Sequence, residues 1–78
     1  MKVTIKYCGD WNYLPNASRL EEELKANFKD ISVELIRSGG GVFEVKVDGE
    51  MVFSKISGPN ATWRFPNDGE VSKLIRQK

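Results

Sequence analysis

The sequence predicts an α/β fold, specifically an α+β two-layer sandwich in which two helices cover one face of a four-stranded mixed sheet. Along the chain, we expect the elements in the order β-α-β-β-β-α, and three observations support this order. Apolar and polar residues alternate in the first and third expected strands, apolar residues recur at helical spacing in two other segments, and Asp48-Gly49 is a strong hairpin signal. The 78 residues are too few for two domains, so we expect residues 1–78 to form a single domain.

The first strand and the first helix are predicted from two different hydrophobic periods. Apolar and polar residues alternate over residues 2–7, which is typical of a strand with one solvent-exposed face. Residues 8–14 break this alternation, so we expect a loop there. Pro15 suits the first turn of a helix, and we expect that helix over residues 15–28. Its apolar positions are Ala17, Leu20, Leu24 and Phe28.

Further strands and a short helix complete the predicted order. The expected strands cover residues 31–37, 42–47 and 50–55. Asn67 followed by Glu70 resembles a capping box with Asn67 as the cap, which predicts a final helix. Because a strand-helix-strand connection makes a parallel pair, the first two strands should be parallel. Because three strands show a polar face, both helices should lie on the opposite face of the sheet.

Composition argues against several classes of protein. Lys and Arg number 12 against 11 Asp and Glu, and this net charge of +1 argues against a nucleic-acid partner. With one Cys and no His, the chain has no internal disulfide, zinc finger or His-based triad, and we expect no metal site. No apolar run approaches the roughly 20 residues of a membrane helix, and the start does not resemble a signal peptide. We therefore expect a cytoplasmic protein with no membrane partner.

Cys8 is the candidate reactive residue. It follows the first predicted strand and precedes the first predicted helix, and ligand sites of open α/β sheets lie outside the carboxyl ends of strands. The positive end of a helix favours a thiolate over a thiol, which predicts raised reactivity. The alternative is that Cys8 is a small buried residue, as free cysteines often are.

The segment Tyr7-Cys8-Gly9-Asp10-Trp11-Asn12-Tyr13-Leu14-Pro15 resembles the redox loop of the selenoprotein W-related family, which joins the SelT, SelW, SelH and Rdx proteins. The similarity continues through residues 41–45, Asp48-Gly49, Ser54-Lys55 and Arg64-Phe65-Pro66. It implies a thioredoxin-like fold and a thiol redox role. It also implies a thiol or disulfide substrate, with no resident cofactor and with glutathione as a possible co-substrate.

The resemblance fails at one position of the redox loop. Trp11 stands where the family usually has selenocysteine or Cys, so no second thiol can resolve a mixed disulfide formed by Cys8. We therefore expect chemistry by Cys8 alone, with Gly9, Asp10 and Trp11 forming its loop. The alternative is a redox-inactive protein-binding module that presents Trp11, Tyr13 and the loop of residues 39–41 to a partner. A Trp codon and the selenocysteine codon differ by a single base, so the natural gene would show whether Trp11 is native.

Two further segments contain candidate contact residues. Three consecutive glycines precede the third strand and most simply indicate a turn with unusual dihedral angles. The resemblance places this loop beside the redox Cys, so Gly40 and Gly41 are candidates for substrate or partner contact. We expect Trp63 and Phe65 to cover the edge of the core, and with Trp11 they could form an apolar cleft.

Overall fold

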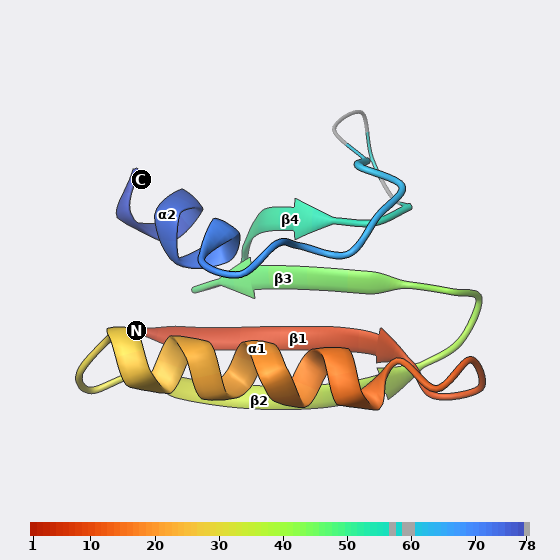
Figure 1. Cartoon of the computed structure of the whole chain (residues 1–78), viewed down its shortest axis with the longest axis horizontal. Coiled ribbons are helices and arrows are strands. Elements are labelled where there is room, and N and C mark those ends of the chain that lie inside the picture. Colours follow the sequence, from red (N-terminus) through yellow and green to blue (C-terminus); the bar gives the residue numbers. More distant parts are fainter. Residues whose placement is uncertain (57, 59–60, 78) are drawn as a thin grey trace.

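The element order agrees with the prediction. A computed structural model describes residues 1–56, 58 and 61–77 of the chain (Figure 1). The elements are β1 (Lys2–Cys8), α1 (Leu14–Asn27), β2 (Ser32–Ser38), β3 (Phe43–Val47), β4 (Glu50–Ser54) and α2 (Glu70–Arg76). Their boundaries lie within a few residues of the predicted ones.

The four strands form one mixed sheet in the order β2-β1-β3-β4. β1 is parallel to β2 and antiparallel to β3, and β3 and β4 form an antiparallel hairpin with an irregularity between Val45 and Lys46. The hairpin turn has positive φ at both central residues, 49° at Asp48 and 88° at Gly49, as expected for the Asp-Gly signal. The Asp48 carboxylate also accepts the backbone N–H of Lys2 at 2.9 Å, so the turn is joined to the start of β1.

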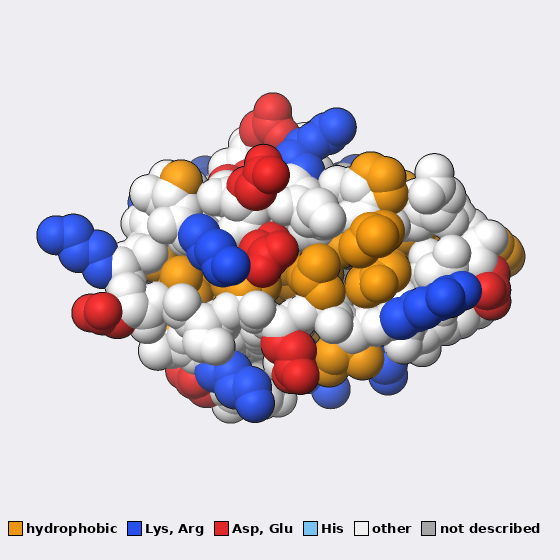
Figure 2. Space-filling view, turned by 90° about the horizontal axis from the view of Figure 1, so that it is seen from below, with side chains coloured by type: hydrophobic (Ala, Val, Ile, Leu, Met, Phe, Trp, Pro, Cys, Tyr) orange, Lys and Arg blue, Asp and Glu red, His pale blue; other side chains and the backbone are white. Residues whose placement is uncertain are grey.

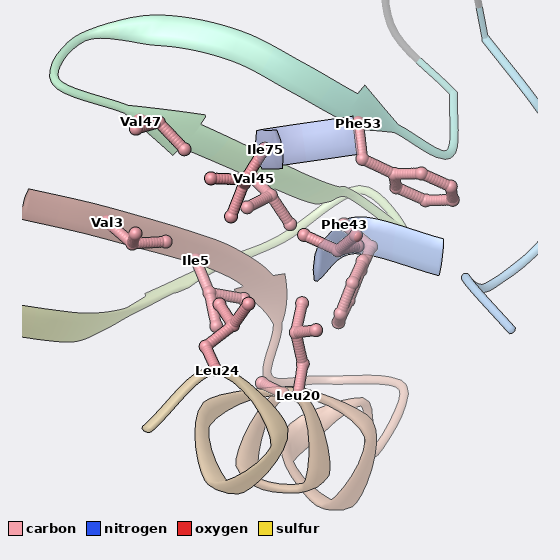
Figure 3. Close-up of a cluster of buried hydrophobic side chains, with 11 residues drawn as sticks. Val3, Ile5, Leu20, Leu24, Phe43, Val45, Val47, Phe53 and Ile75 are labelled. Atoms are coloured by element: carbon pink, nitrogen blue, oxygen red, sulfur yellow. The ribbon is translucent and has the colours of Figure 1, made fainter. Parts of the chain in front are cut away.

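Both helices lie on one face of the sheet, as predicted. α1 packs on β1 and β2, while α2 packs on β4 and touches α1. The core between the two layers is made by alternate residues of the strands and by the apolar stripes of the helices (Figure 3). Its buried side chains are Val3, Ile5, Ala17, Leu20, Leu24, Phe43, Val45, Val47, Phe53, Val71 and Ile75.

α1 begins one residue earlier than predicted and ends one residue earlier. Its N-cap residue is Tyr13, which makes no side-chain capping bond, and Pro15 lies in the first turn. Phe28 has an extended backbone and so lies just outside the helix, although it still packs against the core. On the solvent face, Lys25 and Glu21 form an ion pair at 3.0 Å.

α2 begins later than the predicted capping box implies. The N-cap residue is Gly69, with a φ of 80°, and not Asn67. Half of the box does form, because the Glu70 carboxylate accepts the backbone N–H of Asn67 at 2.9 Å. The first turn is capped from α1 instead: the Glu23 carboxylate accepts the Gly69 N–H at 2.8 Å and the Ser72 hydroxyl at 2.7 Å. A contact between elements distant in sequence has replaced the local cap.

α1 covers β2 only in part. Val33 and Leu35 point toward the helix layer but are half-buried. Seen from the side of α1 and β2, hydrophobic side chains gather in the middle of the surface and charged ones surround them (Figure 2). Neither helix of the described residues has the length and hydrophobicity that crossing a membrane requires.

Candidate functional site

The only cysteine of the chain lies where β1 ends. The N–H of Cys8 donates to the carbonyl oxygen of Val42 at 2.9 Å, and the N–H of Gly9 donates to that of Ser38 at 2.9 Å. Because β1, β2 and β4 run in the same direction, their carboxyl ends lie together at one end of the sheet, at the right of Figure 1. Cys8 therefore lies at the kind of edge where open α/β sheets bind ligands.

The thiol itself is fully buried. Cys8 has 0% exposed surface and is not in a disulfide. Residues 9–13 separate it from α1, and the N–H of Tyr13 donates back to the Cys8 carbonyl oxygen at 3.2 Å. The thiol is therefore neither exposed nor in the first turn of α1, because the loop turns back onto the end of β1, and the reactivity expected of Cys8 stays a prediction. The burial agrees with the alternative that the sequence left open, a small buried Cys.

Trp11 lies across residues 39–41, which we call the glycine loop. A Cβ built on Gly41 would lie 3.0 Å from Cε3 and 3.1 Å from Cη2 of the indole, so the ring occupies the space beside that glycine. The ring also meets Tyr13 edge-on, with centroids 6.1 Å apart, and Trp11 remains 62% exposed. Trp11 thus combines the two roles considered from the sequence, since it packs on the loop and still shows most of its surface to solvent.

The glycine loop has the dihedral angles predicted for a turn. Gly40 has a φ of 69° and Gly41 a φ of 78°, in the region that favours glycine. Only Gly41 is crowded, because a Cβ on Gly40 would meet nothing within 4 Å. Contact of this loop with a substrate or partner stays a prediction.

Arg37 is a site residue that the sequence analysis missed. Its side chain crosses Gly9, where a Cβ would lie 2.7 Å from both Cγ and Cδ, and its Nη2 lies 3.3 Å from Oδ1 of Asp10. Both charged side chains are largely exposed, so the ion pair contributes less than about 1 kcal/mol. The parallel register that sets Arg37 opposite Tyr7 was the available signal.

Trp63 and Phe65 have different environments, although the sequence suggested a shared role. Phe65 packs edge-on against Tyr13 at 4.7 Å and Phe43 at 5.3 Å, so its place at the edge of the core is confirmed. Trp63 is 73% exposed, so the prediction that it covers the core is wrong. Phe65 lines a hollow of about 40 Å³ beside α1 that includes neither tryptophan, so the predicted common cleft is not found there.

Lys55 is a second residue that the sequence analysis did not single out as a site residue. Its Nζ lies 5.6 Å from the ring centroids of both Tyr13 and Phe65. Its backbone is held on both sides, because its N–H donates to Phe43 at 2.9 Å and its carbonyl accepts the N–H of Trp63 at 2.7 Å. The backbone of Lys55 is therefore held just beyond the end of β4.

An ion pair supports the segment that leads into α2. Arg64 donates through both terminal nitrogens to the Glu70 carboxylate, each at 2.7 Å. The hydrogen bond from Arg64 lowers the pKa of Glu70, partial burial opposes this effect, and the N–H of Asn67 lowers the pKa further. The same hydrogen bond raises the pKa of Arg64. Among residues 1–56, 58 and 61–77, no three acidic or Cys side chains gather closely enough to hold a metal ion.

A model of the Rdx family matches residues 2–77. The chain belongs to the Rdx family. Two curated relatives are both Migration and invasion enhancer 1, from Bos taurus (25% identical over 77 residues) and from Mus musculus (25% identical over 75 residues). The alignments cover 99% and 96% of this chain but only 64% and 62% of those proteins, so this chain spans less than two thirds of their length.

Solved structures confirm the thioredoxin-like fold. A protein from Bordetella parapertussis and a selenoprotein W-related protein from Vibrio cholerae each superpose with a TM-score of 0.87 at 24% sequence identity. Each match covers 97% of this chain and 94% and 92% of the respective structures. The recognition of a selenoprotein W-related chain from its redox loop is therefore confirmed, and membership of the Rdx family supports a redox-type function.

The segment that resembles the family's redox loop contains one thiol. Cys8 lies at the end of β1, and three residues later Trp11 packs its indole on the glycine loop. A redox role of Cys8 stays a prediction.

Proposed function

We propose that this Rdx protein is a thiol redox protein that acts through Cys8 alone, by a mixed disulfide with glutathione. The observation that supports it is the position of the chain's one thiol at the carboxyl end of β1, where the resemblance to the family's redox loop places the first redox residue. Trp11 cannot supply a resolving sulfur, so the resolving thiol must come from outside the chain.

The proposed reaction consists of two thiol–disulfide exchanges. The Cys8 thiolate attacks one sulfur of a glutathionylated substrate, so that a Cys8–glutathione disulfide forms, the original disulfide breaks, and the substrate leaves as a thiolate. A glutathione thiolate then attacks the glutathione sulfur of this mixed disulfide. Oxidised glutathione leaves and the Cys8 thiolate is restored, so free glutathione is the reductant.

The burial of Cys8 means that the site must open locally before either exchange. The segments that meet at the end of β1 are residues 9–13 and the glycine loop, and the contact between Trp11 and Gly41 joins them. Loops with few buried contacts open at low free energy, far below global unfolding. We therefore expect the removal of the indole to make the thiol more accessible.

The test is the intact mass of the protein after incubation with oxidised glutathione at mildly alkaline pH. We expect one glutathionyl adduct per chain, which excess reduced glutathione removes and Cys8→Ser abolishes. Trp11→Ala should form the adduct faster, whereas Met51→Ala, which removes an exposed apolar side chain from β4, should leave the rate unchanged. The absence of any adduct on both the wild-type chain and Trp11→Ala would rule out the redox proposal.

The burial of Cys8 and the exposure of two tryptophans also favour a second candidate. In this alternative the chain is a redox-inactive module that binds a protein partner through Trp11 and Tyr13 beside the glycine loop. It predicts that Cys8→Ser leaves partner binding intact while Trp11→Ala weakens it. A failed adduct experiment would therefore leave this candidate as the favoured function.

A further inference from the structure

The Lys55 ammonium lies over two aromatic rings and makes no hydrogen bond within the part of the chain that the structure describes. Its interactions are with the faces of two aromatic rings, Tyr13 and Phe65, each 5.6 Å from Nζ. An ammonium group has three N–H donors, and ring faces leave these donors free for an anion. Within the described part of the chain, no carboxylate lies within ion-pair distance of Lys55.

The charged neighbours of Lys55 are already paired. Arg37 forms an ion pair with Asp10, and Arg64 donates to the Glu70 carboxylate and to the Phe65 carbonyl oxygen. Of these three cations, Lys55 is the one that has no acidic partner among the described residues. It also follows β4, whose carboxyl end lies at the same edge as Cys8, with β3 between them.

The distance between the backbones of Lys55 and Cys8 is about the length of a short peptide. Two strand spacings are about 10 Å, and an extended segment of three residues spans about the same distance. Two exposed aromatic side chains also lie on this part of the surface, Trp11 beside Tyr13 and Trp63, whose N–H bonds to the Lys55 carbonyl. Trp63 is held at a φ of 60°, which is unusual for a bulky residue, so the loop keeps this indole outward at some conformational cost.

We propose that Lys55 binds a carboxylate of a short anionic peptide, and that this peptide is the thiol or disulfide with which Cys8 reacts. The inference rests on the proposed function for the identity of the ligand, but the binding step needs no reaction of Cys8. Tyr13 and Phe65 form the floor beneath the ammonium.

The test uses S-methylglutathione, an anionic tripeptide that cannot form a disulfide, titrated into the full chain carrying Cys8→Ser. Binding is followed by backbone amide chemical shifts, which also show that each variant is folded. We expect Lys55→Gln to weaken binding by at least about tenfold, because a charge-assisted contact is lost. Lys46→Gln removes the same charge from β3, away from the site, and should change binding less than twofold. Lys55→Arg should keep most of the affinity.

The structure of the ligand supplies a second comparison. The diethyl ester of S-methylglutathione lacks both free carboxylates, so it should bind the Lys55 protein as weakly as S-methylglutathione binds Lys55→Gln. The proposal is overturned if S-methylglutathione does not bind, or if Lys55→Gln and Lys46→Gln bind it equally well. Failure of the redox proposal would appear separately, as the absence of a Cys8 adduct with oxidised glutathione in a chain that still binds the thioether.

Discussion

The contact between Trp11 and Gly41 can be measured by comparing two neighbouring glycines. Gly40→Ala and Gly41→Ala each place a side chain in the left-handed region, at φ values of 69° and 78°. That backbone conformation costs an L-residue about 1–2 kcal/mol. Gly40→Ala meets open space, whereas the new methyl group of Gly41→Ala would overlap the indole of Trp11. Gly40→Ala therefore measures the cost of the left-handed backbone conformation alone and is the matched control for Gly41→Ala.

The expected excess follows from the overlap. Forcing a methyl group into packed surroundings costs about 1–3 kcal/mol. We therefore expect Gly41→Ala to lower the free energy of unfolding by about 2–5 kcal/mol and Gly40→Ala by about 1–2 kcal/mol. Replacing Trp11 by Ala removes the obstructing ring, so in that background the two glycine variants should become nearly equivalent.

The assay is urea unfolding at 25 °C, followed by circular dichroism, for the wild type, both glycine variants, Trp11→Ala and the two double variants. The coupling energy between positions 41 and 11 should be about 1–3 kcal/mol, and that between positions 40 and 11 should be near zero. Equal destabilisation by the two glycine variants would refute the contact. An excess for Gly41→Ala that persists without the indole would assign the strain to the backbone instead.

Two further predictions concern the second helix. Glu23→Ala removes the acceptor for the Gly69 N–H and the Ser72 hydroxyl. It should therefore lower the free energy of unfolding in urea by about 1–2 kcal/mol. As a control, replacing the exposed neighbour Glu22 by Ala should change that free energy by less than about 0.5 kcal/mol. Because the pKa of Glu70 is lowered in the folded chain, its stabilising contribution is complete above the ordinary Glu pKa and is lost as the pH falls through the lowered value. The stability difference between the wild type and Glu70→Gln should therefore shrink between pH 6 and pH 2, and a difference that grows on acidification would contradict the sign of the shift.

Local patterns in the sequence were sufficient for the fold. Alternation placed Val3 and Ile5 on the helix side of β1, and the Asp48-Gly49 signal predicted the hairpin turn with positive φ at both positions. These features depend on neighbours in sequence, so a single chain reveals them. The start of α2 did not follow, because Glu23 caps it from α1, and no local pattern encodes a bond across 46 positions.

The candidate site was less predictable because its geometry depends on contacts between loops. The sequence located Cys8 at the end of a strand, but the burial of its side chain depends on how two loops fold over that end. Likewise, Trp63 looked like a core residue by composition, whereas its backbone conformation holds it outward. Lys55 has no distinguishing sequence pattern. Only the structure shows that it lies over Tyr13 and Phe65, with no acidic partner among residues 1–56, 58 and 61–77.

The burial of Cys8 allows one measurement to separate the two candidate functions. If the thiol reacts only in a locally open state, its alkylation rate is slowed by the factor that the opening free energy sets, tenfold for about 1.4 kcal/mol. A local opening of about 1–3 kcal/mol would slow alkylation about 5- to 150-fold relative to an unfolded chain and would leave the thiol usable for exchange. Slowing that equals the full stability, on the order of 5 kcal/mol or more, would mean that Cys8 becomes reachable only on global unfolding. In that case the thiol is structural, and the exposed tryptophans would carry the function.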